Sequence, residues 1–512
     1  MKFSLKSKIG TLCLVALFFL YAVVMVRTAW VSDDAYITFR TVYNFVNGYG
    51  LTYNTAERVQ AYTNPLFMFL VSAFYLLTGE IYYTSICLCI AISLATVLLL
   101  AFKISRTVIG ALLVITILIF SKAFIDYSTS GLENPLTHLI VAIFLFVYFK
   151  YDNSLKKLFL LSVIAAMGAL NRMDTVLLFI PVIIYSFIKL PTLKGTGTII
   201  IGFFPFILWE CFSLFYYGFP FPNTAYAKLN TGIKHIDLAK QGIYYLANSL
   251  KMDPVTILVI VCSLVITLLK KEWSKISVSI GIVLYLIYII FIGGDFMSGR
   301  FLTVPLLAAV IFISQINYSS RILYLISILS VVVVGLSSPY PPILSNVKFG
   351  SERTAGEKIS AKGIADERGW YYQVTGLLKN LNEDTLNKHE LVLAGLRARS
   401  KAPSVIAKKY IGFFGFYAGP QVHIVDFHAL ADPLLARLPA KNRDKWRIGH
   451  FVRSVPDGYI ETLKTGQNKI KDMRLAQYYD KLSLITRGRL FDTKRIKEIW
   501  NINSGKYSNI IH

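Results

Sequence analysis

Two adjacent aspartates follow directly on an apolar N-terminal segment. The stretch "VSDDAYITFRTVYNFVNGYGLTYNTAERVQAYTNPLF", residues 31–67, places Asp33 and Asp34 where that segment ends, and then stays polar, aromatic and charged. One interpretation is structural, a helix N-cap beside a solvated loop carboxylate. The other is catalytic, a general base whose pKa is shifted by its neighbour, or a pair that binds a cation. This stretch alone leaves both open.

Further charged and polar residues recur near the ends of apolar segments. Ionisable groups at such places must face water or the interior of a helix bundle rather than lipid. We therefore treat these residues, with aromatic and polar residues of the 31–67 stretch and one histidine near the C-terminus, as candidate substrate ligands. They are Tyr36, Arg40, Glu57, Arg58, Tyr62, Asn64, Glu133, Arg172, Asp174, Asn223, Lys228, Asp295, Arg300 and His450.

Several of these candidates also have a structural interpretation. Glu133 could cap the helix that begins near Pro135 instead of binding sugar hydroxyls. Asp174 could form an ion pair with Arg172. The glycines before Asp295 could serve only to make a turn. The tyrosines could anchor the chain at a membrane interface.

Composition indicates the kind of protein that carries these residues. Of 512 residues, 55% are hydrophobic and 16% charged, whereas soluble domains carry about 25% charged residues. This composition predicts a membrane protein with many spans. All five cysteines lie in apolar stretches, which excludes a disulfide framework and a zinc site. A net charge of +24 would favour a nucleic-acid partner in a soluble protein, but much of it lies in short loops between apolar runs, so we expect none.

The apolar runs predict about 11 spans. A further run, 65–79, is short for a span, so we interpret it as a half-inserted or juxtamembrane helix. With the lysine-rich N-terminus inside, the connections at 103–106, 150–157, 189–194, 270–275 and around Arg321 fall inside, and all are basic. The runs are 9–29, 83–102, 108–125, 136–149, 157–170, 175–189, 196–217, 254–270, 275–293, 300–316 and 321–337.

The same alternation of inner and outer connections places 31–64, 126–135, 171–174, 218–253, 294–299 and 338–512 on the outer face of the membrane. Two of these outer regions carry further predictions. One is the loop 31–64, part of a transmembrane domain that we expect over 1–337. The other is 338–512, where the short apolar runs 391–395, 411–417 and 422–427 alternate with the helix-like stretches 357–381 and 458–476. That alternation predicts a soluble α/β domain.

Six segments, in order along the chain, carry a family resemblance. They are "DDAYITFR…NFVNGYGLTYNTAERVQAYTNPL", "STSGLENPL", "NRMD", "PNTAYAKL", "GGDFMSGRFLTVPLL" and "VDFHALADPLLAR…RIGH". Together they resemble the bacterial GT-C-type, polyprenyl-phosphate-dependent glycosyltransferases related to the mycobacterial-type terminal β-1,2-arabinofuranosyltransferase. The resemblance covers most of the chain.

The resemblance implies an enzyme of the bacterial inner (cytoplasmic) membrane with its active site on the outer face. Such an enzyme takes a sugar, here with arabinofuranose as one candidate, from a polyprenyl-phosphate carrier and adds it to a cell-envelope glycan. In this class an aspartate of the first outer loop acts as base or acidic anchor, and Asp33 and Asp34 occupy that place. Lys228 and Arg300 lie within resemblance motifs, so we favour them as cations for the leaving phosphate.

The chain also departs from the family pattern. It has Ala429 where the family has glycine, and Gln60 and Ala61 where the family has a glutamate–glycine pair. These changes leave the sugar and the acceptor open. Metal use is open too, because Asp33, Asp34 and Asp295 could hold Mg²⁺ or Mn²⁺ through oxygen ligands, whereas some members of the class use no metal.

A membrane transporter of a polar or lipid-linked substrate is the alternative function, because transporters also bury charged residues. Transporters tend to show repeated halves with broken helices. No such internal symmetry is visible in the sequence.

Overall fold

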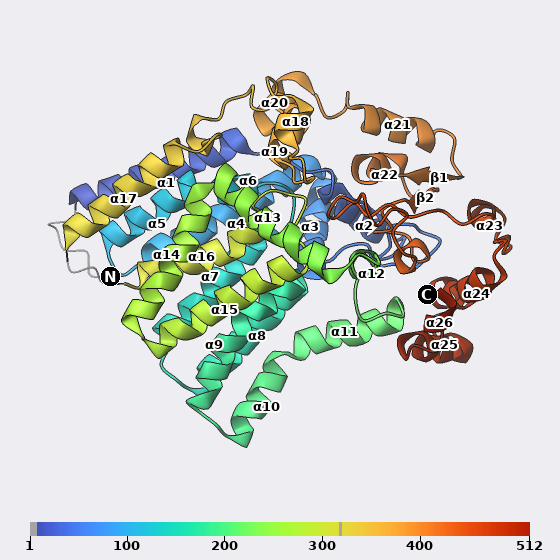
Figure 1. Ribbon diagram of the computed structural model, residues 1–512, viewed down its shortest axis with the longest axis horizontal. Coiled ribbons are helices and arrows are strands. Elements are labelled where there is room, and N and C mark those ends of the chain that lie inside the picture. The colour runs from blue at the N-terminus through green and yellow to red at the C-terminus, as the bar shows by residue number, and fades with distance from the viewer. Residues whose placement is uncertain (1–7, 317–319, 512) are drawn as a thin grey trace. The chain divides into compact units, whose positions relative to one another are not determined.

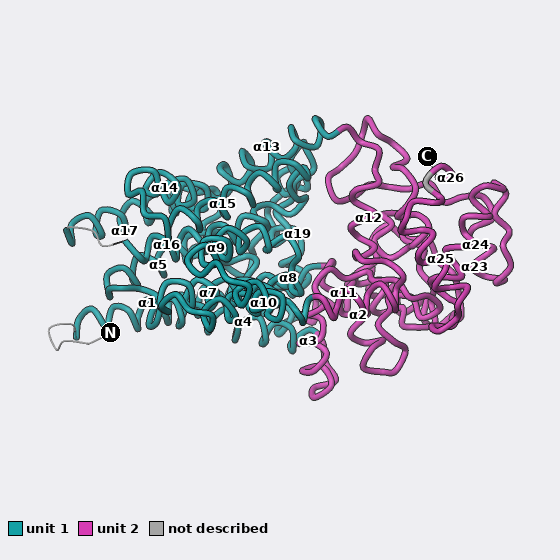
Figure 2. The backbone as a smooth tube through the Cα atoms, turned by 90° about the horizontal axis from the view of Figure 1, so that it is seen from below, with its two compact units in different colours: residues 1–32, 82–206, 235–383 teal, residues 33–81, 207–234, 384–512 magenta. Residues whose placement is uncertain are grey.

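The computed structural model describes residues 8–316 and 320–511, and most of them are helical (Figure 1). The chain forms two compact units, each assembled from three separate stretches (Figure 2). Unit 1 is Met1–Ser32, Tyr82–Phe206 and His235–Glu383, and unit 2 is Asp33–Ile81, Ile207–Lys234 and Asp384–His512. The expected domain boundary at 337 concerns the position of the bilayer and stays a prediction.

Unit 1 is a bundle of helices, most of which lie on the apolar runs of the sequence. A helix satisfies the backbone of a long apolar segment internally. The long helices are α1 (Lys8–Thr28), α4 (Tyr82–Leu99, continued by a π-helical turn Leu100–Ile104), α5 (Val108–Phe120), α7 (Asn134–Lys150), α8 (Leu155–Asn171), α9 (Val176–Ile188), α10 (Leu193–Gly202), α13 (His235–Met252), α14 (Pro254–Lys270), α15 (Trp273–Phe291), α16 (Thr303–Ser314) and α17 (Arg321–Leu336). The shorter ones are α6 (Lys122–Asp126), α18 (Ala355–Lys358), α19 (Glu367–Thr375), α20 (Leu377–Glu383) and 3₁₀ turns at Met173–Thr175, Arg300–Leu302 and Pro342–Leu344.

Helix α16 is the centre of unit 1. All of its residues, Thr303 to Ser314, are buried, and it packs against α5, α7, α14 and α15. A helix that is apolar on every side must be covered on every side. Asp295 and Arg300 lie in the segment directly before α16, so this buried helix fixes the end of the segment that carries them.

Within residues 8–316 and 320–511, three helices are long and apolar enough to cross a membrane: α1, α4 with its π-helical turn, and α15. The number rises to five if each of two bent pairs, α10 with α11 (Phe204–Tyr216) and α13 with α14, is a single span. Six further apolar helices have 10–17 residues. The prediction of about 11 spans is therefore not confirmed by helix length and composition.

Two helical regions differ from the sequence prediction. The run 196–217 is not one helix, because it breaks at Phe203 into α10 and α11. Pro205, in the first turn of α11, has no amide hydrogen, and its ring would clash with a helical carbonyl four residues earlier. In addition, α13 was not expected, since its residues are amphipathic rather than uniformly apolar.

Unit 2 surrounds a small parallel sheet. Strands β1 (Ser404–Lys408) and β2 (Val422–Asp426) pair in register from Ser404–Val422 to Lys408–Asp426. Of the three apolar runs expected in the α/β domain, only 422–427 forms a strand, because 391–395 lies in α21 and 411–417 largely in α22. The helices of unit 2 are α2 (Ala35–Val46), α3 (Pro65–Thr78), α12 (Asn223–Leu229), α21 (Glu390–Arg399), α22 (Gly412–Ala418), α23 (Tyr459–Thr465), α24 (Met473–Arg487), α25 (Thr493–Asn503) and α26 (Ser508–Ile511), with a 3₁₀ turn at Leu435–Arg437.

The segment 33–64 is part of the core of unit 2. Helix α2 packs against α3 and α22. Arg40 of α2 is 1% exposed and donates hydrogen bonds to the carbonyls of Tyr53, Gly415 and Val422. The opening stretch and the C-terminal residues therefore fold together, 375 or more positions apart in the sequence.

Candidate active site

Asp33 is a buried carboxylate that caps a helix distant in the sequence. It lies just before α2, and its Oδ1 accepts a hydrogen bond of 2.7 Å from the amide of Phe413, at the start of α22. A Cβ on Gly412 would come within 1.9 Å of the Asp33 carbonyl oxygen, so only glycine permits this approach. Burial raises the pKa of Asp33 to about 7, and the charge of Asp34 adds to the rise. Asp33 therefore does cap a helix, as the structural interpretation proposed, but the helix is α22 and not α2.

A third carboxylate that the sequence analysis did not single out, Asp426 at the end of β2, interacts electrostatically with Asp34. Asp34 is half-buried, at the first position before α2, and its side chain makes no capping hydrogen bond there. Burial raises the pKa of Asp426 to about 7, and the charge of Asp34 adds to that rise as well. Asp33, Asp34 and Asp426 form what we call the acidic group, in which Asp34 is the most exposed member.

A cluster of histidines and basic residues adjoins the acidic group. The amide of His428 donates to Asp426 at 2.8 Å, and the rings of His428 and His450 lie 4.9 Å apart. Burial lowers the pKa of His428 to about 4, with Lys409 and Arg447 adding to the fall. We call His428, His450, Lys409, Arg447 and Lys228 the histidine cluster.

The same cluster includes Lys228, one of the predicted phosphate cations. Burial lowers the pKa of His450 well below its usual value, and the charges of Arg447 and Lys228 contribute to that fall, so both lie close to the ring. Lys228 itself is exposed, in the last turn of α12. Neutral histidines and exposed cations beside ionisable carboxylates can bind an anion at one end and accept a proton at the other.

Other candidates of unit 2 are engaged in contacts within the unit. The Arg58 guanidinium donates to the backbone carbonyls of Tyr216, Ile485 and Gly488. Asn223 donates to three carbonyls of the loop after β2, those of Ala429, Leu430 and Asp432. These side chains hold loops in place, and in that way Asn223 positions the segment that carries His428.

The remaining candidates of unit 2 are also buried. Tyr36 packs its ring against Phe413 and Phe416 of α22, with ring centres 4.8 and 5.4 Å apart. Glu57 pairs with Arg487 at 3.1 Å. The Tyr62 hydroxyl lies 2.8 Å from that of Tyr217. Asn64 precedes α3 and accepts from Thr38 at 3.5 Å. Their predicted part in substrate binding stays a prediction.

Unit 1 brings five of the predicted residues into one buried group, which we call the Glu133 ion cluster: Glu133, Arg172, Asp174, Asp295 and Arg300. One oxygen of Glu133 accepts from Arg172 and from Arg300, each at 2.9 Å. Arg172 also bonds Asp174 at 3.0 Å, and Arg300 lies 3.6 Å from Asp295. These side chains are 2–11% exposed.

This geometry answers the structural alternatives raised for these residues. Glu133 occupies the position before α7, but its side chain does not cap that helix. Asp174 does pair with Arg172, and it also accepts from the hydroxyl of Tyr285 at 3.0 Å. Gly293 and Gly294, which precede Asp295, have φ values of +87° and +74°, so they do form a turn in a backbone conformation that few other residues adopt.

Metal binding is not shown by the arrangement of ligands. Over residues 8–316 and 320–511, no group of three or more His, Cys, Asp or Glu side chains is placed to hold a metal ion. Asp33 and Asp34 belong to the acidic group of unit 2, and Asp295 to the Glu133 ion cluster of unit 1. The role of Mg²⁺ or Mn²⁺ stays open.

Four residues of the candidate site were missed in the sequence: Lys409, Asp426, His428 and Arg447. The last three lie within the segment "VDFHALADPLLAR…RIGH" on which the family resemblance partly rests. A DxH spacing directly after a strand was the available signal, because strand ends present side chains to loops where ligands bind.

Comparison with known proteins finds a distant similarity to one glycosyltransferase. No known protein-family profile matches the chain, and no solved structure matches it. The chain is 24% identical, over an alignment of 527 residues, to the terminal β-(1→2)-arabinofuranosyltransferase of Mycobacterium tuberculosis. That alignment covers 84% of this chain and 82% of the mycobacterial protein. The similarity thus extends through both units and is that of a distant relative of an arabinofuranosyltransferase.

Proposed function

We propose that the chain is an integral membrane glycosyltransferase of the GT-C type. It moves a sugar, with arabinofuranose the first candidate, from a polyprenyl-phosphate carrier to a cell-envelope glycan on the outer face of the bacterial inner membrane. The observation that carries this proposal is the similarity to an arabinofuranosyltransferase over 84% of the chain. The apolar helices of unit 1 are consistent with a lipid-linked donor.

The proposed chemistry uses the acidic group and the histidine cluster. The acceptor hydroxyl attacks the anomeric carbon of the donor, the bond from that carbon to the phosphate oxygen breaks, and the carrier phosphate leaves with the electron pair. Asp34 receives the hydroxyl proton, since it is the more exposed aspartate, whereas Asp33 is hydrogen-bonded to α22. Lys228 and Arg447 stabilise the departing phosphate.

The test is consumption of a defined donor. Purified protein is incubated with a panel of polyprenyl-phosphate sugars, with and without a cell-envelope glycan, and release of polyprenyl phosphate is measured. We expect one donor to be consumed, faster with the glycan present, and not by the Asp34→Asn variant. If no donor of the panel is consumed by folded protein, the proposed donor class is wrong.

Sidedness gives a separate prediction. Residues 33–81 and 384–512 belong to the same compact unit, so we expect them to lie on one side of the membrane, which the basic loops predict to be the outside. Ala56→Cys and Lys401→Cys, both at exposed positions and in a background without the native thiols, should both react with a membrane-impermeant thiol reagent in intact cells.

Asp152→Cys is the matched control for this experiment. Asp152 is equally exposed but lies in the predicted inner loop 150–157, so its thiol should react only after the cells are permeabilised. Labelling of one unit 2 position without the other would contradict the common side, and labelling of Asp152→Cys in intact cells would reverse the orientation.

A further inference from the structure

Helix α13 is sharply bent relative to α14, as expected for a helix that lies along a membrane surface. It meets α14 at a bend of 111° around Asp253, and Pro254 begins α14. Leu258, Val261 and Val265 of α14 are 44–49% exposed, as expected for a helix that faces lipid. If α14 runs across the bilayer, α13 lies close to the membrane plane.

The surface of α13 fits that position. Ile236, Ile243 and Leu250, each seven residues apart, are 60%, 58% and 45% exposed and form one apolar stripe. The opposite side packs on α15, where a Cβ on Gly242 would come within 2.4 Å of the Ile290 carbonyl oxygen. An exposed apolar stripe on an otherwise polar helix is typical of a helix at the lipid interface.

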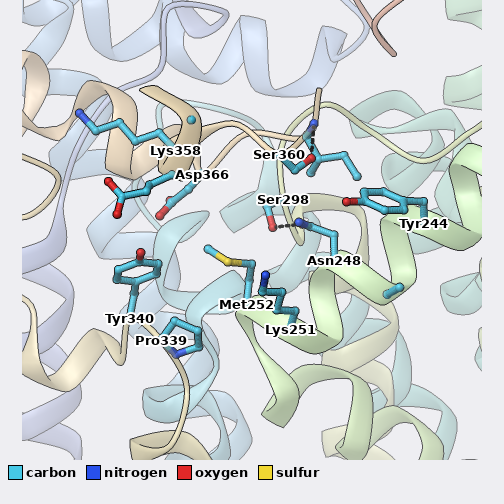
Figure 3. A pocket seen from close by; sticks show the side chains of 14 residues that line it. Tyr244, Asn248, Lys251, Met252, Ser298, Pro339, Tyr340, Lys358, Ser360 and Asp366 are labelled. Carbon is cyan, nitrogen blue, oxygen red and sulfur yellow. Dashed lines mark hydrogen bonds between the residues drawn. The ribbon is translucent and has the colours of Figure 1, made fainter. Parts of the chain in front are cut away.

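A cavity of about 470 Å³ with both polar and apolar lining residues opens beside this stripe. Tyr244, Asn248 and Lys251 of α13 line one side, and with 3.6 residues per turn they fall next to the stripe of Ile243 and Leu250. Figure 3 shows these residues across the cavity from Asp366 and Tyr340. Asn248 is held there by a hydrogen bond of 2.8 Å from Ser298.

The carboxylates at the cavity are already engaged. Asp366 accepts from Lys122 at 2.9 Å and from Arg353 at 2.6 Å. Glu357 accepts from the amide and hydroxyl of Thr354, at 2.6 and 2.9 Å, and so caps α18. Asp366 is therefore already neutralised by two cations, and the side chain of Glu357 is occupied by its cap on α18.

Two lysines on the cavity wall, Lys251 and Lys358, are not paired in this way. In the described part of the chain, neither forms a salt bridge or a side-chain hydrogen bond with an acidic residue. Lys358 lies over the ring of Trp370, with its nitrogen 5.9 Å from the ring centre. Burial lowers the pKa of Lys358 and the nearby Arg353 adds to the fall, while the charge of Asp366 opposes it. A bound anion would offset this repulsion between cations.

We propose that this cavity binds the phosphate group of an anionic membrane lipid, between Lys251 and Lys358, with the acyl chains along the apolar stripe of α13. The aromatic ring of Tyr340 and the amide of Asn248 then face the polar headgroup. The site is separate from the acidic group, the histidine cluster and the Glu133 ion cluster, and lipid binding there does not require sugar transfer.

The experiment measures lipid binding to the purified protein in a neutral detergent. Native mass spectrometry counts bound dioctanoyl phosphatidylglycerol, and thermal unfolding reports the stabilisation it gives. We expect saturable binding and a raised Tm for phosphatidylglycerol, with weaker effects from dioctanoyl phosphatidylcholine, whose net charge is zero. Glycerol phosphate, the anionic group without acyl chains, should bind much more weakly than the lipid.

Single variants locate the site. Lys251→Gln and Lys358→Gln should each weaken phosphatidylglycerol binding by about fivefold, the effect of one cation near an anionic lipid surface. The matched control is Lys240→Gln, on the same helix but 11 residues, about 16 Å, from Lys251. Lys240 is exposed and lies 3.8 Å from Asp237, outside the cavity, so its variant should bind like the wild type.

Four outcomes would overturn the proposal. One is the absence of saturable phosphatidylglycerol binding to the wild type. The second is unchanged binding in both cavity variants, measured by mass spectrometry on folded protein. The third is equal binding of phosphatidylcholine, which would mean that acyl chains rather than the anionic headgroup are recognised. The fourth is equal binding of glycerol phosphate, which would make the ligand a free phosphate ester.

Discussion

Asp34→Asn is expected to lower the rate of sugar transfer by at least about 100-fold, the smaller end of what a general base contributes. The substitution keeps the size of the side chain and removes its ability to accept the acceptor's proton. Because the loss concerns the transition state, kcat should fall while the KM for the donor changes little. Initial rates with the donor identified in the panel give both constants.

Asp33→Asn is the informative comparison, since asparagine can still accept the hydrogen bond from the Phe413 amide. We expect it to fold and to lose less than about tenfold in rate, because Asp33 positions α22 rather than reacting. Asp457→Asn, an 81% exposed side chain of the same unit, should be neutral. A larger loss in Asp33→Asn than in Asp34→Asn would reassign the base to Asp33. Near wild-type rates in both would show that neither aspartate is the base.

Long apolar helices were well predicted from the sequence. The run 157–170 is α8, Leu155–Asn171, and the run 9–29 is α1, Lys8–Thr28. Such runs are long enough to exclude a strand, whereas the short runs 391–395 and 411–417 could not be distinguished from strands by periodicity and lie largely in helices. The helix α13 was missed because its apolar residues recur at intervals of seven rather than forming a run.

The sequence predicted individual charged residues of the candidate sites but not the contacts between them. Charge at the end of an apolar segment is a property of one position, and this property identified all five members of the Glu133 ion cluster. No local sequence pattern predicts contacts between residues that are distant in the sequence. The bond from Phe413 to Asp33, 380 residues apart, and the approach of Asp426 to Asp34 depend on the folding of unit 2 as a whole.

Arg300→Met is expected to cost about 3–5 kcal/mol of stability, the range for removing one partner from a buried ion pair. Arg300 is 11% exposed and donates to Glu133 at 2.9 Å, with Asp295 at 3.6 Å. Without it, Glu133 and Asp174 share the guanidinium of Arg172, and Asp295 loses its ion-pair partner. Arg300→Lys keeps the charge, but one ammonium cannot reproduce the planar contacts of a guanidinium, so we expect an intermediate loss. Thermal unfolding in detergent measures both.

Arg321→Lys is the matched control, because Arg321 is exposed at the start of another helix of unit 1 and its replacement should leave Tm unchanged. A second-site change separates a structural role from donor binding. If the loss in Arg300→Met comes from uncompensated buried carboxylates, adding Asp295→Asn should recover part of the stability, since one of those charges is removed. If Arg300 instead contacts the carrier phosphate, Arg300→Met should reduce donor affinity at nearly unchanged Tm, and Asp295→Asn should restore nothing. The sign of the coupling between residues 295 and 300 therefore decides whether the Glu133 ion cluster is a structural element of unit 1 or a part of the donor site.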